Sequence, residues 1–294
     1  MTIAPMLVPG LFRLLNRVYP GGFGRKTIAG IGRRWLPRGR RVPRARVGNG
    51  FYMSLALDQY IDSAIYFHAF EYSTVQALKQ VLSPGDTAID VGANIGYFTL
   101  LAGRLVGSRG RVVAFEPNPE MVRRLTGNVA LNDYQARVTA HPWALSDVDG
   151  PAHLYVPTTG RDDPGEASMR RQRGWDGVEE QAVVARRLDD LWDHGAVRLI
   201  KLDVEGAELQ VLQGAREVIR IHRPHVICEY NPSTAAAFGY EPAALAAFFR
   251  DIGGYALHAL ASRGIVHDVA PDEPAATGPK VENWWFAPRQ VAAG

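Results

Sequence analysis

One segment decides the fold: Thr87-Ala88-Ile89-Asp90-Val91-Gly92-Ala93-Asn94-Ile95-Gly96-Tyr97-Phe98-Thr99. Its apolar, β-branched beginning is typical of a parallel strand that is buried on both faces. Gly92 and Gly96 then allow a tight turn and a close approach of a ligand to the backbone. A helix follows to about Val106, and its unpaired N–H groups and positive dipole end favour an anionic group. We therefore expect a nucleoside-containing cofactor at this strand, turn and helix.

Strand and helix patterns alternate along the rest of the chain. The expected strands cover residues 87–91, 111–116, 138–140, 197–204, 224–230, 255–260 and 283–287, and the expected helices cover residues 70–82, 97–106, 119–132, 207–221 and 242–252. This alternation predicts a doubly wound, largely parallel sheet with helices on both faces. A short strand at residues 152–156 is followed by residues 157–182, which are rich in Gly, Pro and charge. We interpret residues 157–182 as a long surface loop, either a lid that faces the substrate or an unstructured segment.

The net charge of +3 hides an asymmetry. Residues 1–50 contain eleven Arg and Lys residues and no acidic residue, so residues 51–294 carry a net charge of −8. Such a basic arm suits a membrane surface, a nucleic acid or an anionic substrate, but it can also pack on the acidic body or remain solvated. Within the arm we expect a short amphipathic helix from Pro5 to Tyr19, and then a connector to about Gly50.

Composition excludes several classes of protein. Apolar residues make up 47% and charged residues 21%, which is ordinary for a soluble globular protein. Cys228 is the only cysteine, so an intramolecular disulfide and a two-cysteine metal site are excluded. Its apolar neighbours indicate a buried, inert thiol. No apolar run is long enough to span a bilayer and we find no signal peptide, so we expect a cytoplasmic protein, with a peripheral membrane contact left open.

The glycine turn and the next strand together indicate the type of cofactor. Gly92-Ala-Asn-Ile-Gly96 lacks the Gly-x-Gly-x-x-Gly spacing of dinucleotide-binding enzymes. Glu116 ends the second strand, where a carboxylate can accept hydrogen bonds from both hydroxyls of a ribose. A strand with Asp and a glycine turn, followed by a strand that ends in Glu, predicts binding of S-adenosylmethionine.

Five segments, taken in order, resemble the signatures of FkbM-type methyltransferases: Asp90–Gly96, Phe115–Asn118, Lys201–Glu208, Val211–Ala215 and Pro224–Glu229. The resemblance covers about residues 70–231. It implies the class I methyltransferase fold, an α/β Rossmann-like sheet of seven mostly parallel strands with an antiparallel last strand. It also implies methyl transfer from S-adenosylmethionine to a hydroxyl of a sugar, a glycan or glycolipid, or a natural product. We divide the chain into a basic extension (1–50), a cap (51–85) and the methyltransferase domain (86–290).

The positions of these motifs imply a set of cofactor-binding residues. The set comprises Glu71, Asp90, Gly92, Asn94, Gly96, Phe98, Thr99, Glu116, Asn118, Trp143 and Ala144. The turn residues from Asp90 to Gly96 would surround the methionine half, and Glu116 would bind the ribose. Asn118 and residues 141–144 would lie near the adenine, where Trp143 either stacks on the ring or belongs to the core. Glu71 would reach the methionine end.

Candidate catalytic residues lie at or just beyond the carboxyl ends of the predicted strands, where open α/β sheets place their reactive sites. They are Asp203, Glu205, His141, Lys201 and Glu229. A positioned carboxylate or His could remove the proton of an acceptor hydroxyl. Asp203, Glu205 and Glu229 are also the hard oxygen ligands that Mg²⁺ accepts, and a metal could lower the pKa of that hydroxyl.

Some of these charges have a structural alternative. Glu205 and Glu208 lie where negative charge complements the dipole of the helix that begins near Ala207, and we expect Glu208 to be mainly structural. Lys201 could pair with one of the carboxylates or contact an anionic substrate.

Two other functions are compatible with parts of the sequence. A nucleic-acid methyltransferase would use the Arg-rich arm to bind phosphates. Enzymes that methylate base amino groups usually carry Asp/Asn-Pro-Pro-Tyr/Phe, whereas this chain has Asp203-Val-Glu-Gly and, later, Asn231-Pro-Ser. A non-catalytic binding module is disfavoured by the acidic cluster, because unpaired carboxylates are costly where nothing uses them. We therefore expect a small-molecule or glycan acceptor as partner, and we leave a homodimer and a membrane-surface contact through residues 1–50 open.

Overall fold

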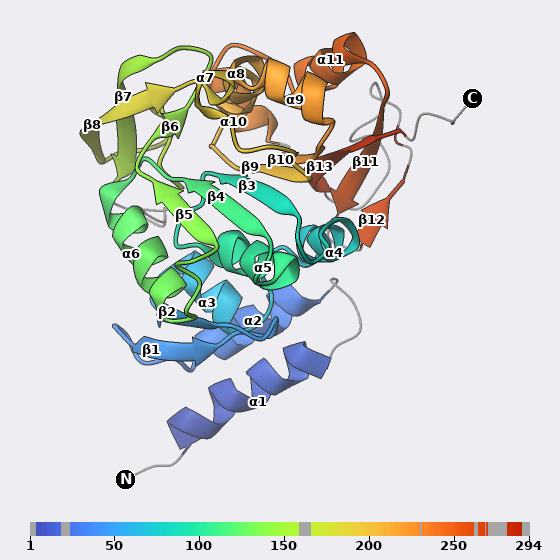
Figure 1. Cartoon of the computed structure of the whole chain (residues 1–294). Helices are drawn as coiled ribbons and strands as arrows, with labels where there is room; N and C mark the ends of the chain where they lie inside the picture. Colours follow the sequence, from blue (N-terminus) through green and yellow to red (C-terminus); the bar gives the residue numbers. More distant parts are fainter. Residues whose placement is uncertain are drawn as a thin grey trace.

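A computed structural model of the protein describes residues 4–18, 24–158, 166–229, 231–261, 264–267, 269 and 281–289, with the side chains of residues 4–8 and 282 outside the description. Figure 1 shows one large sheet with helices on both faces and the N-terminal helices on one outer side. Tyr19 at the end of the predicted helix, residues 20–23 of the predicted connector, residues 159–165 of the predicted loop and residue 230 of the predicted strand lie outside the described ranges. Within these ranges, every helix falls short of the length and apolar character that a membrane span needs.

Among the described residues, eight strands form the large sheet. They are β3 (Thr87–Val91), β4 (Arg111–Phe115), β5 (Val138–His141), β9 (Leu199–Leu202), β10 (His225–Glu229), β11 (Tyr255–Ala261), β12 (Gly264–Val266) and β13 (Val281–Pro288). Their order is β12-β11-β13-β10-β9-β3-β4-β5. Strands β10, β9, β3, β4 and β5 are parallel to one another, and β13 runs antiparallel to both β10 and β11. This arrangement confirms the predicted class I methyltransferase sheet, to which the short hairpin strand β12 is an unpredicted addition.

Each face of the sheet packs against its own helices. One core contains α4 (Tyr72–Val81), α5 (Tyr97–Val106) and α6 (Pro119–Ala130), and the other contains α7 (Leu188–Leu191), α8 (Glu208–Gly214), α9 (Arg216–His222) and α11 (Ala243–Ile252). Ala88 of β3 joins the first core, whereas Ile89 and Val91 join the second. This alternation follows from the two-residue period of a strand.

The prediction of one helix over residues 207–221 is wrong in one respect, because Ala215 separates α8 from α9 with a backbone φ of −114°. Close packing next to it accounts for the break. A Cβ on Gly214 would lie 1.9 Å from the backbone oxygen of Ser146, so the end of α8 lies directly against the backbone at Ser146. The short helix α10 (Pro232–Ala237) follows β10 and was not predicted.

A three-stranded sheet covers one end of the large sheet. It consists of β6 (Ala144–Leu145), β8 (Val178–Arg186) and β7 (Gly150–Pro157), in that order. The predicted loop at 157–182 is therefore too long, because residues 178–182 belong to β8. This strand carries polar side chains on both faces, and it is fixed by antiparallel pairing with β7 from Gly150 to Pro157. Ser168 makes a further bridge to Tyr155.

The N-terminal residues are more ordered than predicted. The expected amphipathic helix is confirmed as α1 (Ala4–Val18), but the expected connector contains α2 (Arg25–Arg33) and β1 (Arg41–Arg46). β1 pairs antiparallel with β2 (Tyr52–Ala56), which leads into α3 (Tyr60–Tyr66). Phe51, Met53 and Leu55 are buried in the same core as α4 and α5. The connector prediction failed because it rested on the Gly and Arg content of these residues, whereas the segments gain their order from packing on the domain.

Candidate functional site

A cleft that is partly open to solvent lies beyond the carboxyl ends of β3, β4 and β9. It is lined by Val91, Gly92, Asn94, Phe115, Glu116, Pro117, Asn118, Met121, Trp143, Ala144, Leu145, Leu154, Ala167, Met169, Asp203, Val204 and Glu205. One part of this wall is apolar and aromatic, and another carries three carboxylates. Such a wall suits a ligand that has an apolar ring and a polar, hydroxylated portion.

The glycine turn forms one wall of the cleft. Gly92 and Gly96 have φ values of 74° and 91°, in the left-handed region that favours glycine. A Cβ on Gly96 would lie 2.5 Å from Cδ1 of Leu125, so this position also lacks space for a side chain. Asn94 between them has a φ of 51°, and Glu205 across the cleft has a φ of 52°. Positive φ at a non-glycine residue costs about 1 kcal/mol or more, and such residues cluster at functional sites.

Glu116 is held at the bottom of the cleft by two backbone donors. The N–H of Asn94 donates to its Oε2 and the N–H of Asn118 to its Oε1, each at 2.8 Å. Burial raises the pKa of Glu116 to about 7, and these two hydrogen bonds oppose the rise. Each carboxylate oxygen keeps a further lone pair for a donor in the cleft.

Asp90 lies behind the turn and is buried. Its Oδ2 accepts a hydrogen bond from Oγ1 of Thr99 at 2.5 Å, while its Oδ1 has no hydrogen-bond partner among the described residues. Burial raises the pKa of Asp90, although the nearby ammonium of Lys201 opposes this. A buried acceptor that lacks a partner is the kind of group that a ligand can satisfy.

The buried Lys201 connects the turn with the acidic residues after β9. Its Nζ donates to Oδ2 of Asp203 at 3.0 Å and lies 4.6 Å from the ring centroid of Phe98. Burial lowers the pKa of Lys201, but the carboxylates of Asp203 and Asp90 more than offset this, so the pKa is raised overall. Lys201 is therefore a permanent cation that orients Asp203.

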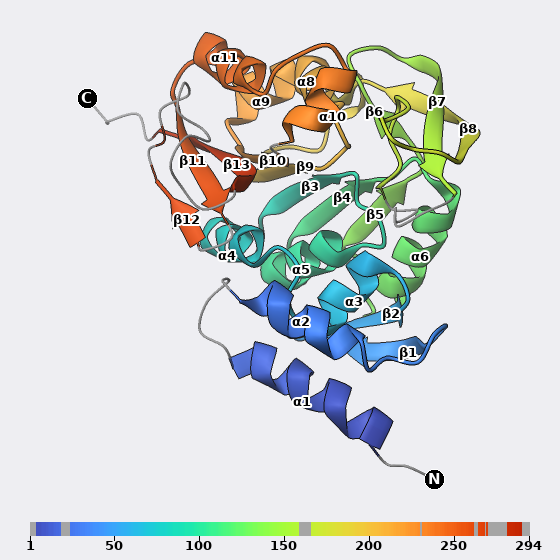
Figure 2. The ribbon, with the colours of Figure 1, turned by 180° about the vertical axis from the view of Figure 1, so that it is seen from behind.

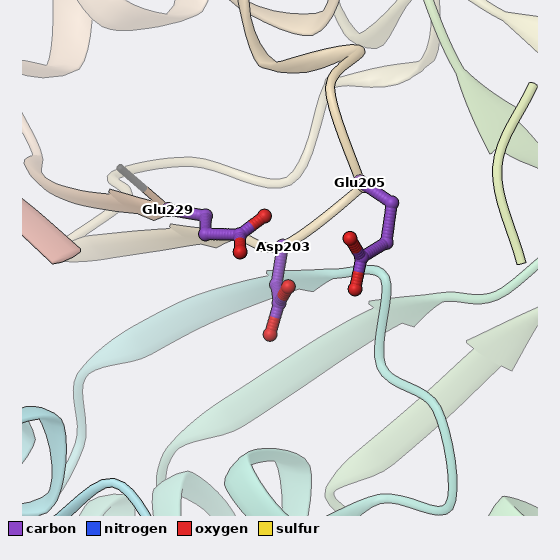
Figure 3. Close-up of side chains that lie close together, drawn as sticks. All are labelled: Asp203, Glu205 and Glu229. Atoms are coloured by element: carbon purple, nitrogen blue, oxygen red, sulfur yellow. The ribbon is translucent and has the colours of Figure 1, made fainter. Parts of the chain in front are cut away.

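Asp203, Glu205 and Glu229 form a cluster of carboxylates (Figure 3). One oxygen of each lies within 4.8 Å of the other two. Burial raises the pKa of Glu205 and of Glu229 well above the ordinary value, and the neighbouring carboxylates raise both further. Oε2 of Glu229 is buried and has no hydrogen-bond partner among the described residues. Such a cluster can accept a proton or, with its hard oxygens, hold a divalent cation.

Glu208 has a structural setting. Its Oε1 accepts from the N–H groups of Val204 and Gly206, each at 3.2 Å, and its Oε2 accepts from the hydroxyl of Tyr240 at 2.9 Å. The carboxylate thus fixes the turn that carries Glu205 at the start of α8.

His141 is not brought into the cleft. Its ring stacks on Phe115 and on Trp143, with centroid distances of 5.4 and 4.7 Å. Burial lowers the pKa of His141, and the imidazole has no place among the residues that line the cleft. We therefore do not retain it as a general base.

The other predicted residues divide into lining and supporting positions. Gly92, Asn94, Glu116, Asn118, Trp143, Ala144, Asp203 and Glu205 line the cleft, whereas Glu71, Asp90, Gly96, Phe98, Thr99, Lys201 and Glu229 lie behind or beside it. Asn118 also caps α6 through its side-chain oxygen, which accepts from the N–H of Glu120 at 3.0 Å. Glu71 accepts from Nδ2 of Asn283 at 2.9 Å, and its charge acts on Lys201.

Sequence reasoning missed the wall formed by Met121, Leu154, Ala167 and Met169. The alternating pattern at 152–156 could have indicated an inward Leu154, but residues 166–169 carry no signal of this kind. They are held in place by Ser168, whose Oγ donates to the backbone oxygen of Glu205 at 2.8 Å. Gln172 donates to the same oxygen at 3.1 Å. This segment therefore closes one side of the cleft.

Comparison with known proteins gives a consistent result. Residues 90–255, more than half of the chain, match the model of the methyltransferase FkbM domain. The methyltransferase sdnD of Sordaria araneosa is 34% identical in an alignment of 160 positions that covers 44% of this chain and 60% of that protein. The 31-O-demethyl-FK506 methyltransferase FkbM of Streptomyces tacrolimicus is 29% identical in an alignment of 209 positions that covers 62% of this chain and 75% of that protein. The hexuronic acid methyltransferase AglP of Haloferax volcanii is 28% identical in an alignment of 155 positions that covers 51% of this chain and 58% of that protein.

Proposed function

The chain belongs to the FkbM methyltransferase family, and from this premise we propose that it transfers the methyl group of S-adenosylmethionine to a hydroxyl group of a sugar-containing or natural-product acceptor. The observation that carries the proposal is the position of the carboxylate Asp203, which lines the same cleft as the glycine turn and Glu116. The proposed donor site and the proposed proton acceptor would therefore share one cavity.

S-adenosylmethionine would be held by carboxylate oxygens that can still accept hydrogen bonds. Glu116 has lone pairs left for the two ribose hydroxyls, and the unsatisfied Oδ1 of Asp90 lies behind the turn beside the methionine half. Trp143, Met121 and the other apolar side chains of the wall offer a surface for the adenine ring. No phosphate needs to be accommodated, in keeping with the short glycine turn.

Asp203 is the proposed general base. The acceptor hydroxyl oxygen would attack the methyl carbon as the carbon–sulfur bond breaks, its proton would pass to Asp203, and S-adenosylhomocysteine would leave. Lys201 holds Oδ2 of Asp203 at 3.0 Å, which orients the carboxylate and leaves Oδ1 for the acceptor. A positioned base of this kind contributes about 10²- to 10⁴-fold to the rate.

Mg²⁺ enters the proposal as an alternative to Asp203 acting as the base, because a carboxylate oxygen that binds the ion is not free to take the proton. Asp203, Glu205 and Glu229 fit such an ion, because one oxygen of each lies within 4.8 Å of the others and Oε2 of Glu229 is buried without a partner among the described residues. When bound, the ion would lower the pKa of an acceptor hydroxyl.

The acceptor class rests on the relatives. One of them is named a hexuronic acid methyltransferase and another a 31-O-demethyl-FK506 methyltransferase, which supports a hydroxylated sugar or natural product. The chain spans about 60% of the length of sdnD, so the activity and acceptor of the whole protein are proposed here and not transferred.

The test has two stages. Calorimetry first measures the binding of S-adenosylmethionine and S-adenosylhomocysteine to the purified protein, and absence of binding would refute the proposal. Transfer of a labelled methyl group to a panel of uronic acids, glycosides and macrolides is then measured with and without EDTA. Asp203→Asn should reduce turnover by about 10²-fold or more while cofactor affinity stays within about threefold. The control is Asp190→Asn, a carboxylate outside the cleft; unchanged turnover in Asp203→Asn would remove Asp203 from the chemistry.

A further inference from the structure

The N-terminal helix α1 has two distinct faces. Its inner face carries Pro9, Phe12 and Asn16, which are spaced three and four residues apart and therefore lie on one side of the helix. Phe12 packs against the cluster of Ala29, Phe67 and Ala69. Nδ2 of the buried Asn16 donates to the backbone oxygen of Arg25 at 3.0 Å. The inner face thus fixes α1 on α2 and the body of the protein.

The opposite side of α1 is apolar and exposed. Leu11, Leu14, Leu15 and Val18, here called the outer stripe, are 55%, 55%, 43% and 68% exposed. Their spacing of three, four and seven residues places them in one row. Single exposed apolar side chains are common, but a contiguous row on a helix that already has a buried face marks an interaction surface. Figures 1 and 2 both show α1 as the outermost element, on the side of the molecule away from α11.

The segment that contains the outer stripe is strongly basic. Residues 1–50 contain eleven Arg and Lys residues and no acidic residue. Arg17, Lys26, Arg34, Arg38, Arg41, Arg44 and Arg46 are exposed. Because no carboxylate is close in sequence, this charge attracts anions at the surface around α1.

Together, the stripe and the charge select one class of partner. A helix with an apolar row, in a strongly basic segment, suits the interface of an anionic bilayer, where the aliphatic side chains enter the headgroup boundary and the cations meet lipid phosphates. A nucleic acid would use the cations but not the four aliphatic side chains. A symmetric dimer through the stripe would bring two basic surfaces together. We propose that the outer stripe of α1 docks the protein on the surface of an anionic phospholipid bilayer.

Vesicle flotation of the full chain tests this inference. The wild type should float with phosphatidylcholine vesicles that contain phosphatidylglycerol, at least about tenfold more than with phosphatidylcholine alone, and high salt should reduce the difference. The variant Leu11→Ser/Leu14→Ser/Val18→Ser should bind the anionic vesicles at least about tenfold more weakly than the wild type.

A matched control is Val148→Ser/Val184→Ser/Ile221→Ser, which changes side chains that are 60%, 45% and 61% exposed but lie outside α1. It should bind as the wild type does. Circular dichroism and thermal melting verify that both variants fold, independently of any cofactor. Equal binding of the two variants, or no preference for anionic vesicles, would overturn the inference. So would a wild-type dimer in light scattering that the α1 variant alone dissociates, since the stripe would then be a protein contact.

Discussion

Gly92 lies so close to Asp203 that a Cβ on Gly92 would be 1.7 Å from the backbone oxygen of Asp203. The N–H of Asp203 also donates to the backbone oxygen of Val91 at 3.0 Å. The turn after β3 and the acidic segment after β9 are therefore in direct contact, and neither can move without the other. This contact couples the proposed donor site with the proposed base.

Gly92→Ala should damage both the cleft and the fold. The φ of 74° costs an alanine about 1 kcal/mol, and the contact with Asp203 must widen, at about 1–3 kcal/mol more. We expect at least about tenfold weaker binding of S-adenosylmethionine, measured by calorimetry, and lower stability in urea. Gly39→Ala is the control, because Gly39 has a φ of 69° but open space around its Cβ position. If both variants bound the cofactor equally well, the contact would not be a determinant of the donor site.

Much of the fold could be predicted because the core strands carry their own pattern. Ile89 and Val91 are β-branched, buried and followed by glycine, so strand, turn and helix were found together. β8 was not predicted because Glu179, Glu180 and Gln181 interrupt any apolar face. The strand forms through its pairing with β7. Long-range pairing of this kind leaves no periodicity in the strand itself.

Residues of the candidate site could be identified from the sequence where a recognisable motif marks the end of a strand. Asp203, Glu205 and Glu116 follow strands and were identified, and the structure brings them to one cleft. His141 also ends a strand, yet its ring turns to stack between Phe115 and Trp143. The direction of a side chain at a strand end depends on its packing, which one sequence does not reveal.

Glu208 should behave as a structural residue. Glu208→Ala leaves the N–H groups of Val204 and Gly206 without their acceptor, and we expect a loss of about 2–4 kcal/mol in the free energy of unfolding, measured with urea. Tyr240→Phe removes a single hydrogen bond and should cost about 1 kcal/mol. Glu208→Gln keeps one acceptor oxygen, so its turnover should stay within about threefold of the wild type. A fall of about 10²-fold in Glu208→Gln would instead indicate a catalytic role.

Ser168→Ala should loosen the segment that closes the cleft. The hydroxyl both donates to the backbone oxygen of Glu205 and accepts from Nε2 of Gln172 at 3.0 Å. Loss of about 1 kcal/mol should raise the rate of tryptic cleavage at Arg170, Arg171 and Arg173 about fivefold. Bound S-adenosylhomocysteine should slow that cleavage, because Met169 lines the cleft. In the control Ser146→Ala, which loses a contact with Asp147 outside the cleft, cleavage at these sites should be unchanged.

Glu116 should make both stability and cofactor binding depend on pH. Its pKa is raised from 4.5 to about 7 by burial, so the folded protein favours the protonated form. The resulting contribution to stability, about 3 kcal/mol, is fully present below pH 4.5 and is lost as the pH rises through about 7. Thermal melting of the cofactor-free protein checks this direction, with Glu116→Gln as the variant that lacks the titration.

Cofactor affinity should follow the opposite course. Ribose hydroxyls donate hydrogen bonds, so S-adenosylmethionine favours the ionised carboxylate and lowers its pKa on binding. Affinity should therefore rise about tenfold between about pH 6 and pH 8, and binding near the pKa of about 7 should release about half a proton per site. Calorimetry in buffers of different ionisation enthalpy measures that proton directly. Glu116→Gln should bind more weakly at high pH and with no pH dependence in this range. A pH-dependent affinity that persists in Glu116→Gln would assign the titration to another group, and the ribose contact would have to be sought elsewhere in the cleft.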